Sequence, residues 1–282
     1  MAVAKGENRG RIAIHYEETG SGEPLVLIGG LTSTLEAWGL MLPELARHLR
    51  VITPDNRGSG RTRLEADDGV RTPERFAGDI LVLADDLGLD RFHLMGVSMG
   101  GMIVQEFALA HPERLASLVI GCSHAGGASV VSASPEDLQA MVAGAGEGAG
   151  EEARMAAMAV QIHPDTPRLR ADRLAWFMKT KTDQPHGPDE LARRIRGISQ
   201  YDVHDRLPGL AVPTLVMTGS HDRLVPGENS RILASRIPGA EFVEIPDAGH
   251  IFFAEQPDAA NAALLDFLER HPISASTNPH AM

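Results

Sequence analysis

The sequence predicts an α/β protein in which helices cover both faces of a mostly parallel β-sheet. Short apolar runs alternate with longer helical patterns through the first half of the chain and again near its C-terminal end. Between about residues 124 and 205 this alternation stops, and helical patterns follow one another without a β-type run. A Gly-x-Ser-x-Gly segment joins one apolar run directly to a helical pattern. We therefore expect a sheet-based core with a helical cap inserted between two of its strands.

Seven β-type runs form the expected sheet. Ile12–Tyr16 alternates at period two, which is typical of a strand with one buried face. Leu25–Ile28 is wholly apolar, which is typical of a strand covered on both faces. Five similar runs follow at Val51–Thr53, Phe92–Met95, Leu118–Ile120, Thr214–Met217 and Phe242–Ile245.

Helical patterns separate these runs. In the expected core they cover Leu40–Leu49, Phe76–Leu87, Met99–Ala110, Asn229–Arg236 and Asp258–Glu269. In the expected cap they cover Pro135–Val142, Glu151–Ile162, Leu169–Thr180 and Asp189–Gln200. The small residues of Ala143–Gly150 predict a flexible linker. Their spacing is weakly similar to a dinucleotide-binding fingerprint, but a helical pattern precedes them, whereas such a site needs a preceding strand. We expect the core to comprise residues 1–123 and 206–270, the cap 124–205, and a disordered tail 271–282.

Composition excludes several classes of function. The 282 residues include 26 Lys and Arg against 38 Asp and Glu, a net charge of −12, which disfavours nucleic acid and anionic membrane surfaces as partners. The single cysteine, Cys122, cannot form an internal disulfide, and we expect it to be a small buried residue. No run approaches the roughly 18 apolar residues of a membrane span. We therefore expect a cytoplasmic protein with no membrane association.

The segment Gly96-Val-Ser98-Met-Gly100 carries the strongest chemical signal. It follows the run Phe92–Met95 and opens the helical pattern Met99–Ala110. A strand-to-helix turn this tight strains the backbone of its middle residue and lifts that side chain clear of the sheet. Small residues are needed on both sides, because a side chain there would collide with the neighbouring strand or helix. Ser98 is therefore the predicted nucleophile.

With this segment in its strand–turn–helix context, the chain resembles the α/β-hydrolase superfamily from Ile12 to about Glu269. It looks most similar to the small bacterial esterases, enol-lactonases and cofactor-free haloperoxidases. The resemblance implies an eight-stranded, mostly parallel sheet, a helical cap after strand six, and a nucleophile, an acid and a histidine in that chain order. Related dehalogenases and epoxide hydrolases use aspartate as nucleophile, so a serine at position 98 argues against both activities.

A base and an acid are needed to activate the serine. His250, in a loop after the last β-type run, matches the family's Gly-His pair, and we expect it to be the base. Asp222 follows the run Thr214–Met217 in the family's Gly-x-x-Asp pattern, and we expect it to orient the imidazole. Asp247, three residues before His250, is the rival acid, although it suits a loop turn better.

The tetrahedral oxyanion needs preorganised N–H groups. The resemblance assigns them to Met99, which follows the nucleophile, and to Leu31, in the loop after Leu25–Ile28. Related proteins usually have His-Gly where this chain has Gly29-Gly30, which puts in doubt how rigidly the loop is held. A second family segment, Asp55–Thr62, is expected to be architectural, with Arg57 holding nearby carbonyls.

Pocket residues are harder to assign from sequence, because a stripe of Met or aromatic residues at helical spacing more often forms core. The candidates come from the cap, from the turn after each strand and from the helix after Ser98. They are Gly30, Met102, His124, Met141, Met158, Trp176, Phe177, Val225 and Ile251.

These features predict a serine hydrolase that cleaves a neutral, partly hydrophobic ester or lactone through an acyl-enzyme, without a cofactor or metal. Two alternatives keep the same triad: perhydrolysis, with hydrogen peroxide as acyl acceptor, and hydrolysis of a carbon–carbon bond. A third is a ligand receptor that retains the hydrolase fold. The expected partner is a small-molecule substrate, and the chain is expected to be a monomer or homodimer.

Overall fold

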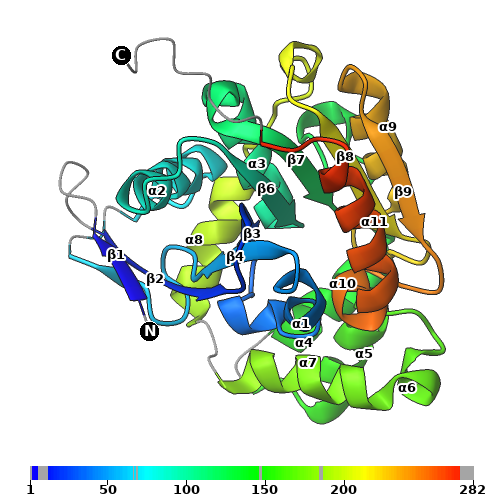
Figure 1. Ribbon diagram of the computed structural model, residues 1–282. Coiled ribbons are helices and arrows are strands. Elements are labelled where there is room, and N and C mark those ends of the chain that lie inside the picture. Colours follow the sequence, from blue (N-terminus) through cyan, green and yellow to red (C-terminus); the bar gives the residue numbers. More distant parts are fainter. Residues whose placement is uncertain are drawn as a thin grey trace, which may run out of the picture.

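A nine-stranded sheet forms the centre of the computed structural model, which describes residues 2–5, 12–65, 67, 69–145, 148–183 and 187–273 (Figure 1). Eight strands follow the order β1-β2-β4-β3-β6-β7-β8-β9, and the short β5 pairs with β2. The strands are β1 (Ala2–Lys5), β2 (Ile12–Thr19), β3 (Glu23–Ile28), β4 (Leu49–Pro54), β5 (Arg63–Leu64), β6 (Phe92–Val97), β7 (Leu115–Gly121), β8 (Thr214–Gly219) and β9 (Glu241–Ile245).

The predicted sheet is confirmed. From β4 through β3, β6, β7 and β8 to β9 every neighbouring pair is parallel, whereas β1, β4 and β5 each pair with β2 antiparallel. All seven β-type runs lie in strands, and β6 and β7 are buried at every position. The sequence patterns did not indicate β1 or β5.

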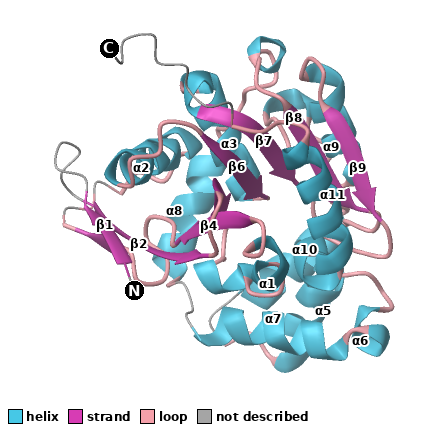
Figure 2. Ribbon diagram, viewed as in Figure 1, coloured by secondary structure: helices cyan, strands magenta, loops and turns pink. Residues whose placement is uncertain are grey.

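Helices cover both faces of this sheet, as Figure 2 shows. Those of the core are α1 (Leu42–Leu45), α2 (Pro73–Asp86), α3 (Met99–Ala110), α9 (Gly227–Arg236), α10 (Phe252–Glu255) and α11 (Pro257–Glu269). Alternate residues of β3 belong to different hydrophobic clusters: Val26 and Ile28 pack with α2 and α3, and Leu25 and Leu27 pack with α1 and α11. A strand of period two thus contributes to two cores, which explains its wholly apolar sequence.

One predicted helix is wrong in extent. The pattern Leu40–Leu49 gives only the single turn Leu42–Leu45, and Leu49 begins β4. Leu49 pairs with Glu23 in the parallel ladder between β3 and β4, so this residue joins the sheet instead of the predicted helix.

The helical insertion lies where predicted, after the sixth strand of the eight-strand path. In the described part of the chain it contains α4 (Pro135–Ala145), α5 (Glu151–Gln161), α6 (Thr166–Leu169), α7 (Ala171–Asp183) and α8 (Pro188–Ile198). Helices α5, α6 and α7 lie together at the bottom of Figure 1. Because α4 extends through Ala145, the linker predicted from Ala143 is shorter; residues 146 and 147 and the predicted tail from 274 lie outside the described residues. The exact boundaries of core and cap stay a prediction.

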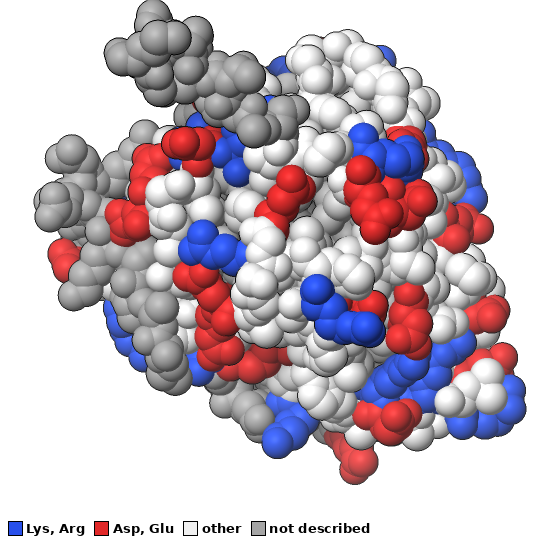
Figure 3. All heavy atoms as spheres, in the orientation of Figure 1, with Lys and Arg blue, Asp and Glu red and all other residues white. Residues whose placement is uncertain are grey.

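Charges are mixed on the molecular surface. On the face drawn in Figure 3, acidic and basic side chains lie interspersed. Many surface charges form ion pairs, such as Arg270–Glu241 and Arg231–Glu244. Within the described residues, no helix combines the length and apolar character needed to cross a bilayer.

Candidate active site

Ser98 occupies a sharp turn between β6 and α3. Its backbone has φ 57° and ψ −121°, a conformation that residues other than glycine rarely adopt. A Cβ on Gly96 would lie 2.2 Å from the carbonyl oxygen of Gly100, and a Cβ on Gly100 would lie 2.2 Å from that of Ile28. The two glycines thus allow strand, turn and helix to approach closely enough to hold the Ser98 side chain outward.

His250 and Asp222 form a buried pair beside this turn. His250 Nδ1 lies 2.8 Å from Asp222 Oδ2, and the other carboxylate oxygen accepts hydrogen bonds from the N–H groups of Leu224 (3.0 Å) and Val225 (2.8 Å). Asp222 comes from the loop after β8 and His250 from the loop after β9, so neighbouring parallel strands bring them together. Glu255 accepts the N–H of Gly249 at 2.7 Å and so anchors the histidine loop.

The environment of His250 favours its protonated form. Burial lowers the pKa of the imidazole, but the negative Asp222 carboxylate and the Cys122 side chain together raise the pKa of His250 well above its ordinary 6.5. The Cys122 thiol lies against this pair: its sulfur, an Asp222 carboxylate oxygen and a His250 ring nitrogen lie within 4.8 Å of one another. Cys122 is fully buried, as predicted, and burial raises the pKa of its thiol.

Ser98 and His250 line one cavity of about 290 Å³. Leu31 and Gly30, in the loop after β3, line it too, and a Cβ on Gly30 would lie 3.2 Å from Ser98 Cβ and 3.6 Å from Ser98 Oγ. The N–H of Leu31 has no hydrogen-bond partner among the described residues. Met99 is the first residue of α3, so its N–H has no partner within the helix. Both N–H groups predicted for the oxyanion are therefore available beside the serine.

The cavity is lined mainly by apolar residues of the core loops and the cap. Four of the nine predicted pocket residues, Gly30, Met141, Phe177 and Ile251, are among them. The remaining lining residues are Thr32, Ser33, Val97, Val142, Gln161, Leu191, Ile195, Leu224 and Phe253.

The other five predicted pocket residues do not line the cavity, because each makes its contacts in another part of the structure. Met102 and Met158 are buried in the two hydrophobic clusters, and Trp176 packs against Gly39. His124 accepts the N–H of Gly126 at 3.0 Å, and burial lowers its pKa to about 4. Val225 lies beside the acid, where its N–H binds Asp222.

Sequence reasoning missed the contribution of α8. Leu191 and Ile195 are four residues apart in a helix that is otherwise rich in charge, and both line the cavity. That spacing places them on one face, a signal that could have indicated them. Ile195 and Val142 are 48% and 76% exposed, so the cavity opens to solvent between α4 and α8.

Comparison with known proteins places this chain in a family. The family described as alpha/beta hydrolase fold matches residues 23–257, a range that includes Ser98, Asp222 and His250. The chain belongs to the α/β-hydrolase family. RutD of Azorhizobium caulinodans, whose name describes it as a carbamate hydrolase, is 31% identical over 257 residues, which cover 90% of this hydrolase and 94% of RutD.

Two solved structures are similar to this hydrolase. A thermophilic esterase from Thermogutta terrifontis has 30% identity and a TM-score of 0.80, covering 96% of this chain and 99% of its own. The enol-lactonase from Burkholderia xenovorans LB400 has 29% identity and a TM-score of 0.78, covering 92% and 97%. The chain is thus a hydrolase whose relatives act on different carbonyl compounds.

Replacing Gly96 with alanine should destabilise this hydrolase by about 2–3 kcal/mol, because the new methyl group would collide with the Gly100 carbonyl. Urea denaturation measures the change. Gly209→Ala is the matched control, since a Cβ there meets nothing within 4 Å, and it should change stability by less than about 0.5 kcal/mol. Equal stability of the two variants would contradict the close packing inferred for the turn.

Proposed function

We propose that this hydrolase cleaves neutral carboxylic esters or lactones with an apolar acyl portion through an acyl-enzyme on Ser98. One observation carries the proposal: Ser98, Leu31 and His250 line a single cavity, where His250 is bonded to Asp222 and the Leu31 N–H has no hydrogen-bond partner among the described residues. A nucleophile, a base with its orienting acid and an oxyanion donor are the groups that acyl transfer requires.

In the proposed mechanism Ser98 Oγ attacks the substrate carbonyl while His250 Nε2 takes the serine proton. Asp222, bonded to Nδ1, fixes the tautomer that leaves Nε2 free and stabilises the imidazolium once it forms. The N–H groups of Leu31 and Met99 bind the oxyanion, and His250 then protonates the departing alcohol. Water, activated by His250 in the same way, attacks the acyl-enzyme and releases the acid and the free serine.

The cavity lining supports a neutral substrate. None of the described residues that line it is Lys, Arg, Asp or Glu, and the polar side chains among them are Thr32, Ser33, Ser98, Gln161 and His250. A small anion such as carbamate would leave most of the 290 Å³ volume empty and would find no Lys or Arg side chain among the described lining residues to pair with. An ester or lactone with a hydrophobic acyl part fills that space, and its burial there is favourable.

Turnover of a panel of p-nitrophenyl esters from acetate to laurate, with several lactones beside them, tests this function. We expect hydrolysis with a preference for medium acyl chains, labelling of Ser98 by a fluorophosphonate, and loss of both in Ser98→Ala. A folded protein that is neither labelled nor active would contradict the proposal. Faster acyl transfer to hydrogen peroxide, or turnover of a β-diketone but no ester, would favour one of the alternatives that use the same triad. Release of a single product equivalent from a stable complex would favour a receptor.

Replacing Asp222 with asparagine should lower kcat by about 10⁴, because an amide favours the wrong imidazole tautomer. Asp247→Asn is the matched control. Asp247 is exposed and has φ 51°, which asparagine also tolerates, so kcat should change less than about twofold. Steady-state kinetics measure both variants, and the opposite ranking would assign the acid to Asp247.

The pH dependence of kcat/KM should have its acid limb above pH 6.5. The base must be neutral to accept a proton, and the Asp222 carboxylate raises the pKa of His250 above that value against the effect of burial. Activity therefore rises with pH through the raised pKa, and in Asp222→Asn the residual acid limb should move to lower pH. Folding stability depends on pH in the opposite direction to activity. The stability that this pair contributes is fully present below pH 6.5 and is lost as pH rises through the folded pKa. An acid limb that does not move in Asp222→Asn would contradict the assigned cause.

A further inference from the structure

The loop that carries the Leu31 N–H begins with two glycines, Gly29 and Gly30, which have no side chains to hold this part of the loop in place. A Cβ on Gly29 would lie 2.8 Å from Ser33 Cβ, so the loop as folded has no room for a side chain there. An oxyanion donor must nevertheless point in a fixed direction before the charge develops, since reorientation during the reaction would consume the stabilisation. The loop must therefore be held by contacts to its backbone.

Three successive carbonyl groups of this loop are bonded. Asn56 Nδ2 donates to the Gly29 oxygen (3.0 Å), and the N–H of Ser33 donates to the Gly30 oxygen (3.2 Å). Arg194 Nη1 donates to the Leu31 oxygen at 2.7 Å. The peptide that bears the Leu31 N–H is the one that bears the Gly30 carbonyl, and the bonds from Asn56 and Arg194 fix the peptides before and after it.

Arg194 comes from cap helix α8 and is fully buried. Its Nη2 donates to the Arg57 carbonyl (2.7 Å) and to Ser59 Oγ (2.8 Å), and its Nε donates to Glu190 (2.9 Å). All three guanidinium nitrogens are thus used, and one planar group joins the Leu31 loop to the segment Asp55–Thr62. The predicted architectural role of that segment fits this contact, although Arg57 itself is paired with Asp79.

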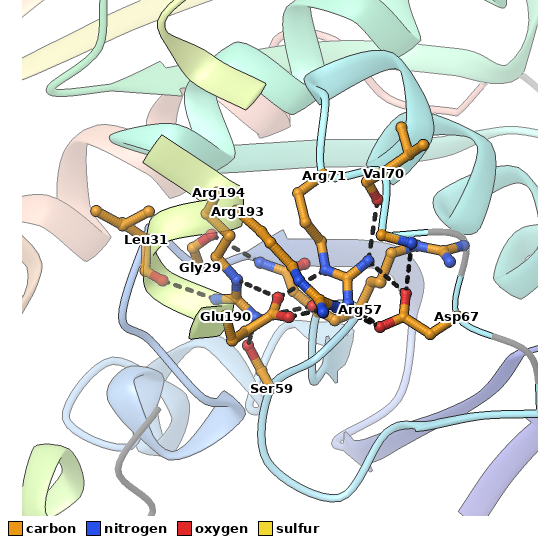
Figure 4. Close-up of polar contacts among 12 residues, drawn as sticks. Gly29, Leu31, Arg57, Ser59, Asp67, Val70, Arg71, Glu190, Arg193 and Arg194 are labelled. Carbon is orange, nitrogen blue, oxygen red and sulfur yellow. Dashed lines mark hydrogen bonds and ion pairs between the residues drawn. The ribbon is translucent and has the colours of Figure 1, made fainter. Parts of the chain in front are cut away.

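The counter-charge of Arg194 is held in turn. Figure 4 shows Glu190 between Arg194 and Arg71, whose Nε and Nη2 donate to the two Glu190 oxygens at 2.7 and 2.9 Å. Arg71 also binds Asp67, which pairs with Arg193. A buried arginine whose three guanidinium nitrogens all donate hydrogen bonds, and whose carboxylate partner is itself fixed, is strongly restricted in orientation, which suits it to set the geometry of a loop.

Helix α8 therefore faces the active site in two ways. Leu191 and Ile195 line the cavity, while Glu190 and Arg194 form the buried network with the core. We propose that Arg194 is a positioning residue that orients the Leu31 N–H, so that seating α8 on the core shapes the cavity and sets the oxyanion hole together. This inference rests on the proposed function, in which the Leu31 N–H stabilises the oxyanion.

The test compares Arg194→Met with Arg193→Met. Arg193 is the preceding residue of α8, its side chain is 38% exposed and it binds Asp67 of the same network, but it makes no hydrogen bond to the Leu31 loop among the described residues. Removing an oxyanion donor outright lowers kcat by about 100–1,000-fold. Loosening one should lower kcat by about 10–100-fold and leave KM within about threefold, since the interaction is made in the transition state. Arg193→Met should change neither constant more than about twofold.

A readout specific to the oxyanion comes from a trifluoromethyl ketone that carries the preferred acyl chain. The ketone adds to Ser98 and places a negative oxygen in the oxyanion hole, whereas the corresponding alcohol occupies only the cavity. In Arg194→Met, affinity for the ketone should fall by the same factor as kcat/KM, and affinity for the alcohol should stay within about threefold. Arg194→Lys keeps the charge but not the planar fork, and it should be intermediate in both measurements.

Circular dichroism and thermal melting establish that the variants are folded. Should Arg194→Met not fold, Arg194→Lys carries the same comparison with Arg193→Met. The inference is overturned if wild-type ester turnover is intact while a folded Arg194 variant keeps its kcat and ketone affinity, or if ketone and alcohol affinities fall equally. Failure of the proposed function looks different: the wild-type protein itself would then lack Ser98-dependent turnover.

Discussion

The close approach of three backbone segments around Ser98 is the constraint on which the site depends. Without side chains at positions 96 and 100, β6, α3 and the end of β3 come within contact distance, and the serine is held in a backbone conformation with positive φ. The same proximity places Gly30 against the serine and brings the loop after β3 to the nucleophile. A larger residue at either glycine would separate the strand from the helix and move the oxyanion loop away with it.

Parallel strands then gather the chemistry at one edge of the sheet. Strands β3, β6, β7, β8 and β9 are consecutive neighbours and run in the same direction, so the loops after them meet at their carboxyl ends. Leu31, Ser98, Cys122, Asp222 and His250 each follow a different one of these strands. The order of strands in space, rather than in sequence, makes neighbours of residues more than 200 positions apart.

Two buried groups that can carry a charge, the Asp222 carboxylate and the Arg194 guanidinium, lie near the cavity. On one side the Asp222 carboxylate is satisfied by two backbone N–H groups and by His250, and these three bonds fix its orientation. On the other side the Arg194 guanidinium is satisfied by two carbonyl oxygens, a hydroxyl and Glu190. The cavity contacts the first system through His250 and the second through Leu31. In the proposed reaction, its apolar surroundings would strengthen both systems and limit competition from water.

The sequence by itself determined the strands of the parallel sheet, the position of the insertion and the candidates Ser98, Asp222 and His250. These depend on local signals: apolar runs of strand length, a strand–glycine–helix turn, and polar residues directly after strands. It overextended the helix at Leu40–Leu49, because the helical pattern does not register that Leu49 pairs with Glu23 in the sheet.

Only the tertiary structure decided which cap residues face the cavity and which face the core. Trp176 and Phe177 are adjacent in α7, yet one packs against Gly39 and the other lines the cavity. Arg194 lies in a charged helix whose sequence is typical of a solvent-exposed face. It is nevertheless fully buried, where it bonds the carbonyl of Leu31, 163 residues away. The periodicity of a sequence indicates which residues share a helix face. Which face is buried depends on the surface that the helix packs against, and that surface exists only once the sheet and its loops have folded.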